Sequence, residues 1–222
     1  VFDLQKIQDR LLNVNDTPKI KMPVKIPAIM KKWKKDCIIW KLPKKGMKYY
    51  SGVDTGEGIS SDNSVIEIID QDGYQVFEFA SNKIKPYEFS ELVRAVGIYY
   101  NKSLLVVEKM SAGHTVVDNL YDSNNRYLNL YKYKQYDAKG KMRKKPGFET
   151  SGKSRPIIIN RFVEWFDKGQ VCINSKNLLN EMKTFQMDDK GKVQATTGAK
   201  DDRVMAFCMA IEGLVNGVWY IW

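Results

Sequence analysis

One short run limits the possible folds of this chain more than any other: Leu104, Leu105, Val106 and Val107 are followed directly by Glu108. A continuous apolar run without alternating polar positions is typical of a strand that is buried on both faces. The run therefore predicts a central strand in a sheet that helices cover on both sides.

The remaining segments predict a mixed α/β sheet of this kind. Apolar positions between turn residues predict strands at residues 49–54, 64–70, 74–80, 104–107, 128–133 and 170–173. Helical spacing predicts helices at residues 86–100, 113–121, 154–168, 178–185 and 201–215. Asp201 is the expected N-cap of the last helix, and residues 71–73 and 188–191 are typical of hairpin turns.

The first 47 residues differ from the rest of the chain. They carry lysine-rich stretches such as residues 31–35, together with four of the seven prolines. We expect an extended arm or linker at residues 1–47, with a short helix near residues 2–12, packed on one domain formed by residues 48–222. Residues 134–153 are polar and strongly basic.

The charge of the chain favours a polyanionic partner. Lys and Arg total 36 against 26 Asp and Glu, a net charge of +10, and such an excess is typical of proteins that bind nucleic acid or acidic membranes. No uncharged apolar run approaches the roughly 18 residues that span a bilayer, so we expect no membrane partner. The three cysteines form no cluster with each other or with histidine, which argues against a zinc site.

Acidic residues interrupt apolar surroundings at three places. Asp54 ends the first predicted strand, Glu108 ends the central strand, and Asp201 and Asp202 open the last helix. Each acid alone is more often a turn former or a helix cap. Several carboxylates at one edge of a sheet would repel one another, and a divalent cation relieves that repulsion. Oxygen ligands suit Mg²⁺ or Mn²⁺, and two such ions can promote in-line displacement at a phosphodiester.

Three motifs occur in order along the chain: GVDTGEG at residues 52–58, VVE at 106–108 followed by Gly113, and KDDRVMA at 200–206. Residues 84–86, 99–101 and 150–156 add supporting matches. Together these motifs resemble the nuclease domain of large terminase subunits, the DNA-packaging motors of tailed bacteriophages. The resemblance covers about residues 38–216 and implies a ribonuclease H-like fold and two-metal cleavage of double-stranded DNA.

The resemblance also implies roles for single residues. Asp54 would be the central ligand that bridges both ions, and Glu108 the ligand from the second strand. One of Asp201 and Asp202 completes the site, with Asp202 favoured as the ligand and Asp201 as cap. Glu57 matches an acidic position in part of the family and is either an auxiliary ligand or an exposed turn residue.

Partners and place of action follow from the same resemblance. The chain has no GxxxxGK[ST] phosphate loop, so we expect the nuclease half alone, with residues 1–47 leading from an ATPase domain of a longer chain. The start at Val1 is consistent with such a fragment. The expected partners are double-stranded DNA, the portal protein and the small terminase subunit. The expected setting is the cytoplasm of the infected bacterial host, without secretion, and the expected substrate is concatemeric viral DNA.

A second feature is a basic stretch interleaved with tyrosines at residues 131–145. This composition suits contacts to a phosphate backbone without base readout, although charge runs are usually solvated loops. The expected DNA-binding residues are Lys132, Lys134, Lys139, Lys141, Arg143, Lys144 and Lys145.

Two other functions fit the same residues. The first is another ribonuclease H-like nuclease, of the resolvase or transposase type, which would prefer branched DNA. The second is a non-catalytic module that grips DNA or docks on the portal, which would bind DNA without cutting it.

Overall fold

The computed structural model describes residues 1–14, 19–56, 62–122, 124, 126–136, 140–187 and 193–220. At its centre lies a five-stranded sheet with the strand order β1-β4-β3-β2-β5. The strands are β1 (Cys37–Ile39), β2 (Tyr49–Asp54), β3 (Ser64–Asp70), β4 (Gln75–Ser81) and β5 (Leu104–Val107). Neighbouring strands are antiparallel except β2 and β5, which run parallel. The predicted mixed sheet is confirmed.

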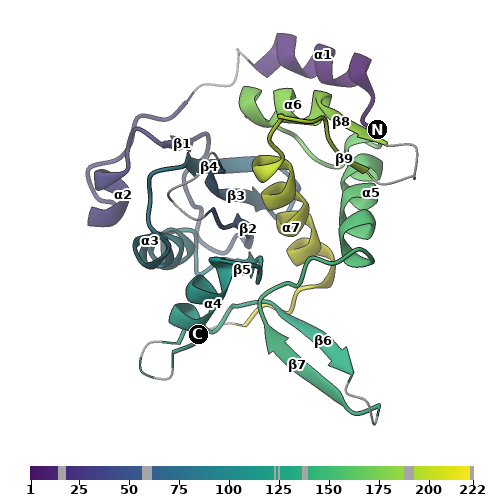
Figure 1. Cartoon of the computed structure of the whole chain (residues 1–222). Coiled ribbons are helices and arrows are strands. Elements are labelled where there is room, and N and C mark those ends of the chain that lie inside the picture. The colour runs from purple at the N-terminus through teal and green to yellow at the C-terminus, as the bar shows by residue number, and fades with distance from the viewer. Residues whose placement is uncertain are drawn as a thin grey trace.

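Helices cover both faces of this sheet (Figure 1). One face carries α2 (Ala28–Lys32), α3 (Pro86–Tyr99) and α4 (Gly113–Tyr121). The other carries α1 (Leu4–Asn13), α5 (Ser154–Asp167), α6 (Lys176–Lys183) and α7 (Asp202–Asn216). Successive residues of a strand enter opposite cores: Val106 packs on the α7 side and Val107 on the α3 side. The apolar run at 104–107 is buried on both faces, as its composition predicts.

A glycine lets α7 lie directly on β2. A Cβ atom at Gly52 would stand 1.7 Å from the backbone oxygen of Ala206 and 2.5 Å from the backbone nitrogen of Ala210. Any side chain would therefore push the helix away from the strand. This contact sets the start of α7 beside the carboxyl end of β2.

The N-terminal region contributes more structure than its composition suggests. The short helix expected near residues 2–12 is present as α1, and Phe2 and Ile7 are buried in the core on the α7 side. Residues 37–39 form the edge strand β1, which pairs with β4 although it precedes the expected boundary at residue 47. Three residues between lysines and prolines are too few to show an alternating pattern.

Two small hairpins stand outside the central sheet. Strands β6 (Lys132–Tyr136) and β7 (Met142–Pro146) form a hairpin that projects from the body (Figure 1). The alternative of a solvated loop for the basic stretch at 131–145 is therefore wrong for the parts that form β6 and β7, and a hairpin that is polar on both faces lacks a period-2 signal. Strands β8 (Phe185–Met187) and β9 (Val193–Ala195) form the second hairpin, and its predicted tip at 188–191 lies outside the described residues.

Three further strands differ from expectation. The strand predicted at 128–133 is displaced, since Leu130 forms only a single bridge to Leu105 and β6 begins at Lys132. The strand predicted at 170–173 reduces to one bridge between Cys172 and Tyr74, and β4 accordingly starts at Gln75. Bridges of this kind depend on a tertiary partner, which a local pattern does not reveal. Within the described ranges, no helix has the length and apolar character needed to cross a lipid bilayer.

Candidate active site

Two carboxylates lie side by side at the carboxyl ends of β2 and β5. Val53 and Val107 are register partners in this parallel pair, and the Glu108 amide donates to the Val53 carbonyl oxygen at 3.0 Å. The next residues of the two strands are Asp54 and Glu108. Because side chains alternate along a strand, both acids fall on the face that α7 covers.

The surroundings of Asp54 oppose its ionisation. Burial raises the pKa of Asp54 well above its usual range, and the adjacent Glu108 raises this pKa further by its charge and by a hydrogen bond. The charges of Asp202 and Asp201 act in the same direction. Carboxyl groups from three separate segments of the chain therefore come close enough at this end of the sheet to raise the pKa of Asp54.

Asp202, in the first turn of α7, is held by a neighbouring loop. Its Oδ2 atom accepts hydrogen bonds from the backbone nitrogen of Asn63 at 2.9 Å and from Asn63 Nδ2 at 3.0 Å, and the residue is only 8% exposed. Burial is the largest cause that raises the pKa of Asp202, and the charges of Asp201 and Asp62 add to it, whereas the Asn63 bonds lower it.

Asp201 occupies the N-cap position of α7 without capping it. Its side chain makes no capping bond and instead forms an ion pair with Arg155 of α5. The capping acceptor is Glu181 of α6, whose Oε2 lies 2.9 Å from the Arg203 amide nitrogen and 3.4 Å from that of Val204. The prediction of Asp201 as a side-chain cap is wrong, because a carboxylate from another helix satisfies the first turn.

Arg203 joins the start of α7 to α6 and to β4. Its Nη1 atom lies 2.7 Å from Glu181 Oε1, and its Nε atom lies 3.4 Å from Glu78 Oε1. Glu78 faces Glu67 across β3 and β4, and both side chains are buried. Arg203, which directly follows Asp202, is thus held in a polar network behind the acids at the ends of β2 and β5.

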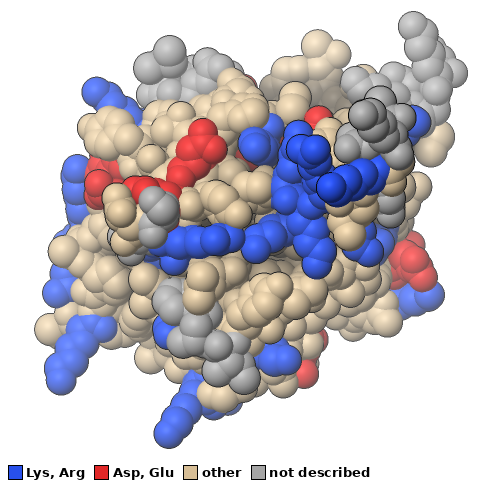
Figure 2. Space-filling model, turned by 90° about the horizontal axis from the view of Figure 1, so that it is seen from below, with Lys and Arg blue, Asp and Glu red and all other residues tan. Residues whose placement is uncertain are grey.

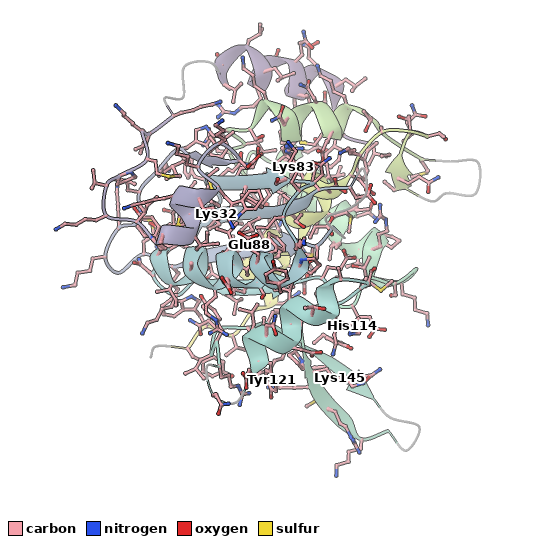
Figure 3. The ribbon with its side chains drawn as sticks, turned by 60° about the vertical axis from the view of Figure 1, so that its left-hand side comes forward. Lys32, Lys83, Glu88, His114, Tyr121 and Lys145 are labelled. Carbon is pink, nitrogen blue, oxygen red and sulfur yellow. The ribbon has the colours of Figure 1, made fainter. Side chains whose placement is uncertain are left out.

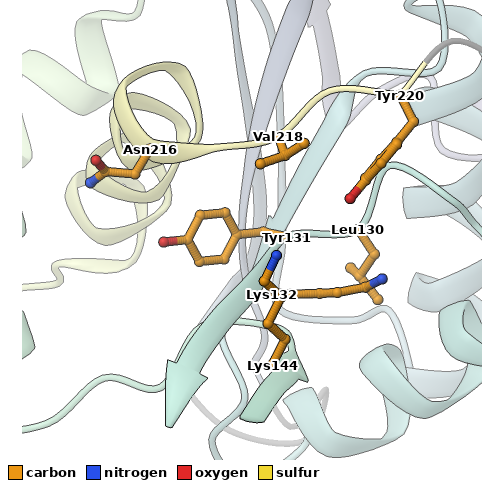
Figure 4. Close-up of a pocket in the computed structure, with 7 residues that line it drawn as sticks. All are labelled: Leu130, Tyr131, Lys132, Lys144, Asn216, Val218 and Tyr220. Atoms are coloured by element: carbon orange, nitrogen blue, oxygen red, sulfur yellow. The ribbon is translucent and has the colours of Figure 1, made fainter. Parts of the chain in front are cut away.

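The basic hairpin is anchored to α7 at its base. The Tyr131 hydroxyl donates to Glu212 Oε1 at 2.8 Å, and Arg161 pairs with the same carboxylate. A cavity of about 40 Å³ separates the hairpin base from the segment after α7 (Figure 4). Its lining residues are Leu130, Tyr131, Lys132, Lys144, Asn216, Val218 and Tyr220.

The hairpin presents most of the predicted DNA-binding residues to solvent. Five of them are exposed: Lys134, Lys141, Arg143, Lys144 and Lys145. Lys132, at the hairpin base, is partly buried, and Lys139 lies outside the described residues. Viewed from the side on which the hairpin projects, Lys and Arg side chains form a band across the molecule (Figure 2). The single histidine, His114, is exposed in the first turn of α4 (Figure 3).

Comparison with known proteins agrees with this architecture. Residues 51–214 match the model of the terminase RNase H-like domain. The chain belongs to this family. The match runs from β2 to the last turns of α7 and so includes every strand of the central sheet except β1.

Solved structures of terminase nucleases share the fold. Those of the large terminase nuclease from thermophilic phage G20c with bound cobalt and with bound magnesium each give a TM-score of 0.63 at 18% identity, over 88% of this chain and 90% of theirs. The large terminase nuclease domain of Thermus phage P74-26 gives 0.62 at 18% identity, over 84% and 90%. No curated protein sequence matches the chain.

The types of side chain that converge at this site of the terminase domain are ones that bind divalent cations. The converging groups are carboxylates, and the buried Thr55 Oγ1 next to Asp54 has no hydrogen-bond partner among the described residues. As the side chains stand, however, no group of three or more His, Cys, Asp or Glu in the described ranges is arranged to hold a metal ion. Asn63 and Arg155 engage Asp202 and Asp201, so ion binding would require these carboxylates to turn toward Asp54.

Three residues that contact Asp201, Asp202 or the first turn of α7 are not identified by the sequence analysis. Asn63 lies in a stretch without a pattern of its own, Arg155 lies in a supporting motif, and Glu181 belongs to an ordinary amphipathic helix. Their partners are 139, 46 and 22 residues away in the chain. Glu57 lies outside the described residues, and its role stays a prediction.

Proposed function

We propose that this chain is a metal-dependent endonuclease domain that cuts double-stranded, concatemeric viral DNA during genome packaging. The observation that carries the proposal is the adjacency of Asp54 and Glu108 on parallel strands, with Asp202 and Asp201 near enough to raise the pKa of Asp54. Membership of the terminase family and the metals named for related structures support it.

The acids would divide the work of metal binding. Asp54 lies between Glu108 and the start of α7, as a ligand shared by two ions would, and Glu108 and Asp202 would complete the set. Mg²⁺ or Mn²⁺ bound there would supply Lewis acidity for in-line displacement at phosphorus. Asp201 would act with Arg155 at the rim of the site, and Glu57 would be an auxiliary ligand.

The hairpin would hold the phosphate backbone of the duplex. Lys134 and Lys144 are register partners on opposite strands, and like charges placed directly opposite destabilise a hairpin. An anionic partner would relieve that repulsion. Lys132, Lys139, Lys141, Arg143 and Lys145 would extend the same surface. Such contacts read no base edges, so we expect little sequence preference.

The further partners follow from the family. We propose that the portal protein, the small terminase subunit and the ATPase domain of the same full-length chain are partners of this domain. The setting would be the cytoplasm of the infected bacterial host. A test is co-purification of the full-length chain with each partner, compared with a chain that lacks residues 48–222.

A variant of Asp54 tests the activity directly. Asp54→Asn keeps the shape of the side chain and removes its charge, so plasmid cleavage in Mg²⁺ or Mn²⁺ should fall by more than the roughly 10–100-fold that loss of an outer-shell partner costs. Asp72→Asn, in the exposed turn at the opposite edge of the sheet, is the matched control. Normal cleavage by Asp54→Asn would show that the proposed site is wrong.

One observation favours a second function. Asp201 and Asp202 are both engaged by other side chains, and the described residues hold no ready three-acid metal group. A non-catalytic DNA-gripping or portal-docking module is consistent with this. Such a module would bind duplex DNA with equal affinity before and after Asp54→Asn and would cut none at any Mn²⁺ concentration. A resolvase or transposase-type nuclease would instead prefer branched over linear DNA.

A further inference from the structure

The positive charge of this chain is concentrated in one segment. Residues 19–48 contain eleven lysines and a single acid, Asp36, so this segment carries +10, the net charge of the whole chain. The projecting hairpin belongs to the remainder, in which basic and acidic residues balance. The segment therefore contributes a positively charged surface of its own. The proposed contacts between the hairpin and DNA do not account for this surface.

Sheet topology brings one part of this segment to the edge that holds the acids. Strand β4 runs parallel to β2, because each is antiparallel to β3, and β1 runs antiparallel to β4. The carboxyl end of β2, the carboxyl end of β4 and the amino end of β1 therefore lie next to one another at the same end of the strands. Asp54 pairs with Val65, Val65 with Ala80, and the Ala80 amide donates to the Asp36 carbonyl oxygen.

Five exposed lysines lie near these strand ends, on the side of the sheet that is farther from the hairpin. They precede β1 or follow β4, and none makes an ion pair within the described ranges. These residues, the β1–β4 lysine cluster, are Lys31, Lys34, Lys35, Lys83 and Lys85.

The acid in the first turn of α3 is already engaged. Glu88 accepts a hydrogen bond from Trp33 Nε1 at 2.8 Å and pairs with Lys32, which fixes α2 on α3. Figure 3 shows Lys32 and Lys83 on one side of α3 and Lys145 of the hairpin on the other. Unpaired like charges held together on a surface repel one another and attract polyanions.

We propose that the β1–β4 lysine cluster is a second contact surface for the phosphate backbone of double-stranded DNA, on the far side of the carboxylates from the hairpin. Three strand spacings separate β2 from β1, about 14 Å in total, which corresponds to about four base pairs of duplex. A duplex is stiff over this length. A duplex that lies on the hairpin and on the acids at the ends of β2 and β5 continues over the cluster. It is then held on both sides of the cut.

This inference rests on the proposed function, because it needs a duplex at the acidic edge. The chain offers a matched pair of variants to test it. Lys34→Gln/Lys35→Gln removes two charges from the cluster. Lys44→Gln/Lys45→Gln removes two charges from exposed lysines of the same segment, but they lie between β1 and β2 and so at the opposite edge of the sheet.

Fluorescence anisotropy with a duplex of about 30 base pairs, in EDTA over a range of salt, measures the contacts. The cluster variant should bind about five to ten times more weakly at about 0.1 M salt, and its log–log salt slope should fall by about two. The control pair should change affinity less than about twofold, because phosphate contacts are local at this ionic strength. Thermal melting should be the same for both variants.

Other outcomes overturn the inference in distinct ways. Equal losses in both variants would show that only total charge matters. Unchanged binding in both, with DNA binding retained by the parent chain, would show that the cluster does not contact DNA and would leave the proposed function standing. Absence of DNA binding and cleavage in the parent chain would remove the proposed function itself.

Discussion

Glu181 of α6 binds Arg203 of α7 twice, accepting from its backbone amide at 2.9 Å and from its guanidinium Nη1 at 2.7 Å. The first of these bonds caps the helix that carries Asp202, and the second neutralises a partly buried arginine. Because Glu181 serves as the cap, the Asp201 carboxylate is left to pair with Arg155 beside the acidic edge. The position of the candidate metal ligands thus depends on a contact between two helices behind them.

Glu181→Ala should destabilise the fold and disturb the site together. Loss of a helix cap and of one partner of a partly buried ion pair should lower the free energy of unfolding by about 2–4 kcal/mol. Glu181→Gln keeps an acceptor for the amide and should lose less. Calorimetric titration with Mn²⁺ should show affinity reduced about 10–100-fold. Glu164→Gln, at an exposed glutamate of α5, should change neither quantity, and a Mn²⁺ affinity unaltered by Glu181→Ala would contradict the positioning role.

Gly52→Ala should separate α7 from β2. The added methyl group would overlap the backbone of Ala206, which cannot move without displacing the helix, so we expect a loss of about 3 kcal/mol or more in denaturant unfolding. Gly152→Ala is the control, since a Cβ atom there meets nothing within 4 Å. If Gly52→Ala were as stable as Gly152→Ala, the close packing of α7 on β2 would be in error.

Asp54→Asn should have opposite effects on stability without and with metal. Desolvation, followed by the charge of the adjacent Glu108, raises the pKa of Asp54 well above the usual range, so the amide should stabilise the metal-free fold near neutral pH. Mn²⁺ should stabilise the parent chain by about 2.7 kcal/mol at 100 times its dissociation constant and should not stabilise the variant. Thermal melts with and without Mn²⁺ test both statements. A metal-induced shift in Asp54→Asn equal to that of the parent would remove Asp54 from the ligand set.

The Glu67–Glu78 pair should make stability fall as pH rises. Burial, followed by the charge of Glu78, raises the pKa of Glu67 well above its usual range. The folded state therefore keeps a proton that the unfolded chain loses near pH 4.3, and this stabilisation is lost as pH rises from there through the raised folded pKa. Urea unfolding from pH 5 to 8 should show a shallower decline for Glu67→Gln than for the parent. Glu91→Gln, at an exposed position, should reproduce the parent profile, and an identical profile for Glu67→Gln would refute the assignment.

Lys134→Gln/Lys144→Gln should weaken DNA binding without harming the fold. Two lost phosphate contacts should lower the salt slope by about two, while removal of two facing like charges should leave the melting temperature equal or slightly higher. Anisotropy and thermal melts of the same samples provide both readings. A lower melting temperature with an unchanged salt slope would mean that these lysines serve the hairpin and not DNA.

Local sequence pattern was sufficient for the elements that make the acidic edge. Strands β2, β3 and β5 and helix α4 begin and end where alternation, apolar runs and turn residues place them, because burial of these segments depends on their own side chains. The same patterns put Asp54 and Glu108 at strand ends. Very short or polar elements lacked such a signal: β1 is three residues long, and β6 and β7 are polar on both faces.

The resemblance favoured Asp202 over Asp201 as the ligand, but only the tertiary structure showed how each of the two is held. In sequence they are adjacent acids at a helix start, equally able to cap it. In the fold, Asn63 from the loop before β3 binds Asp202, Arg155 from α5 binds Asp201, and Glu181 from α6 takes over the cap. Each of these contacts joins residues far apart in the chain, and packing of whole elements brings them together. The sequence by itself therefore determined which acids reach this edge, whereas the packing of α5, α6 and α7 decided how each one is held.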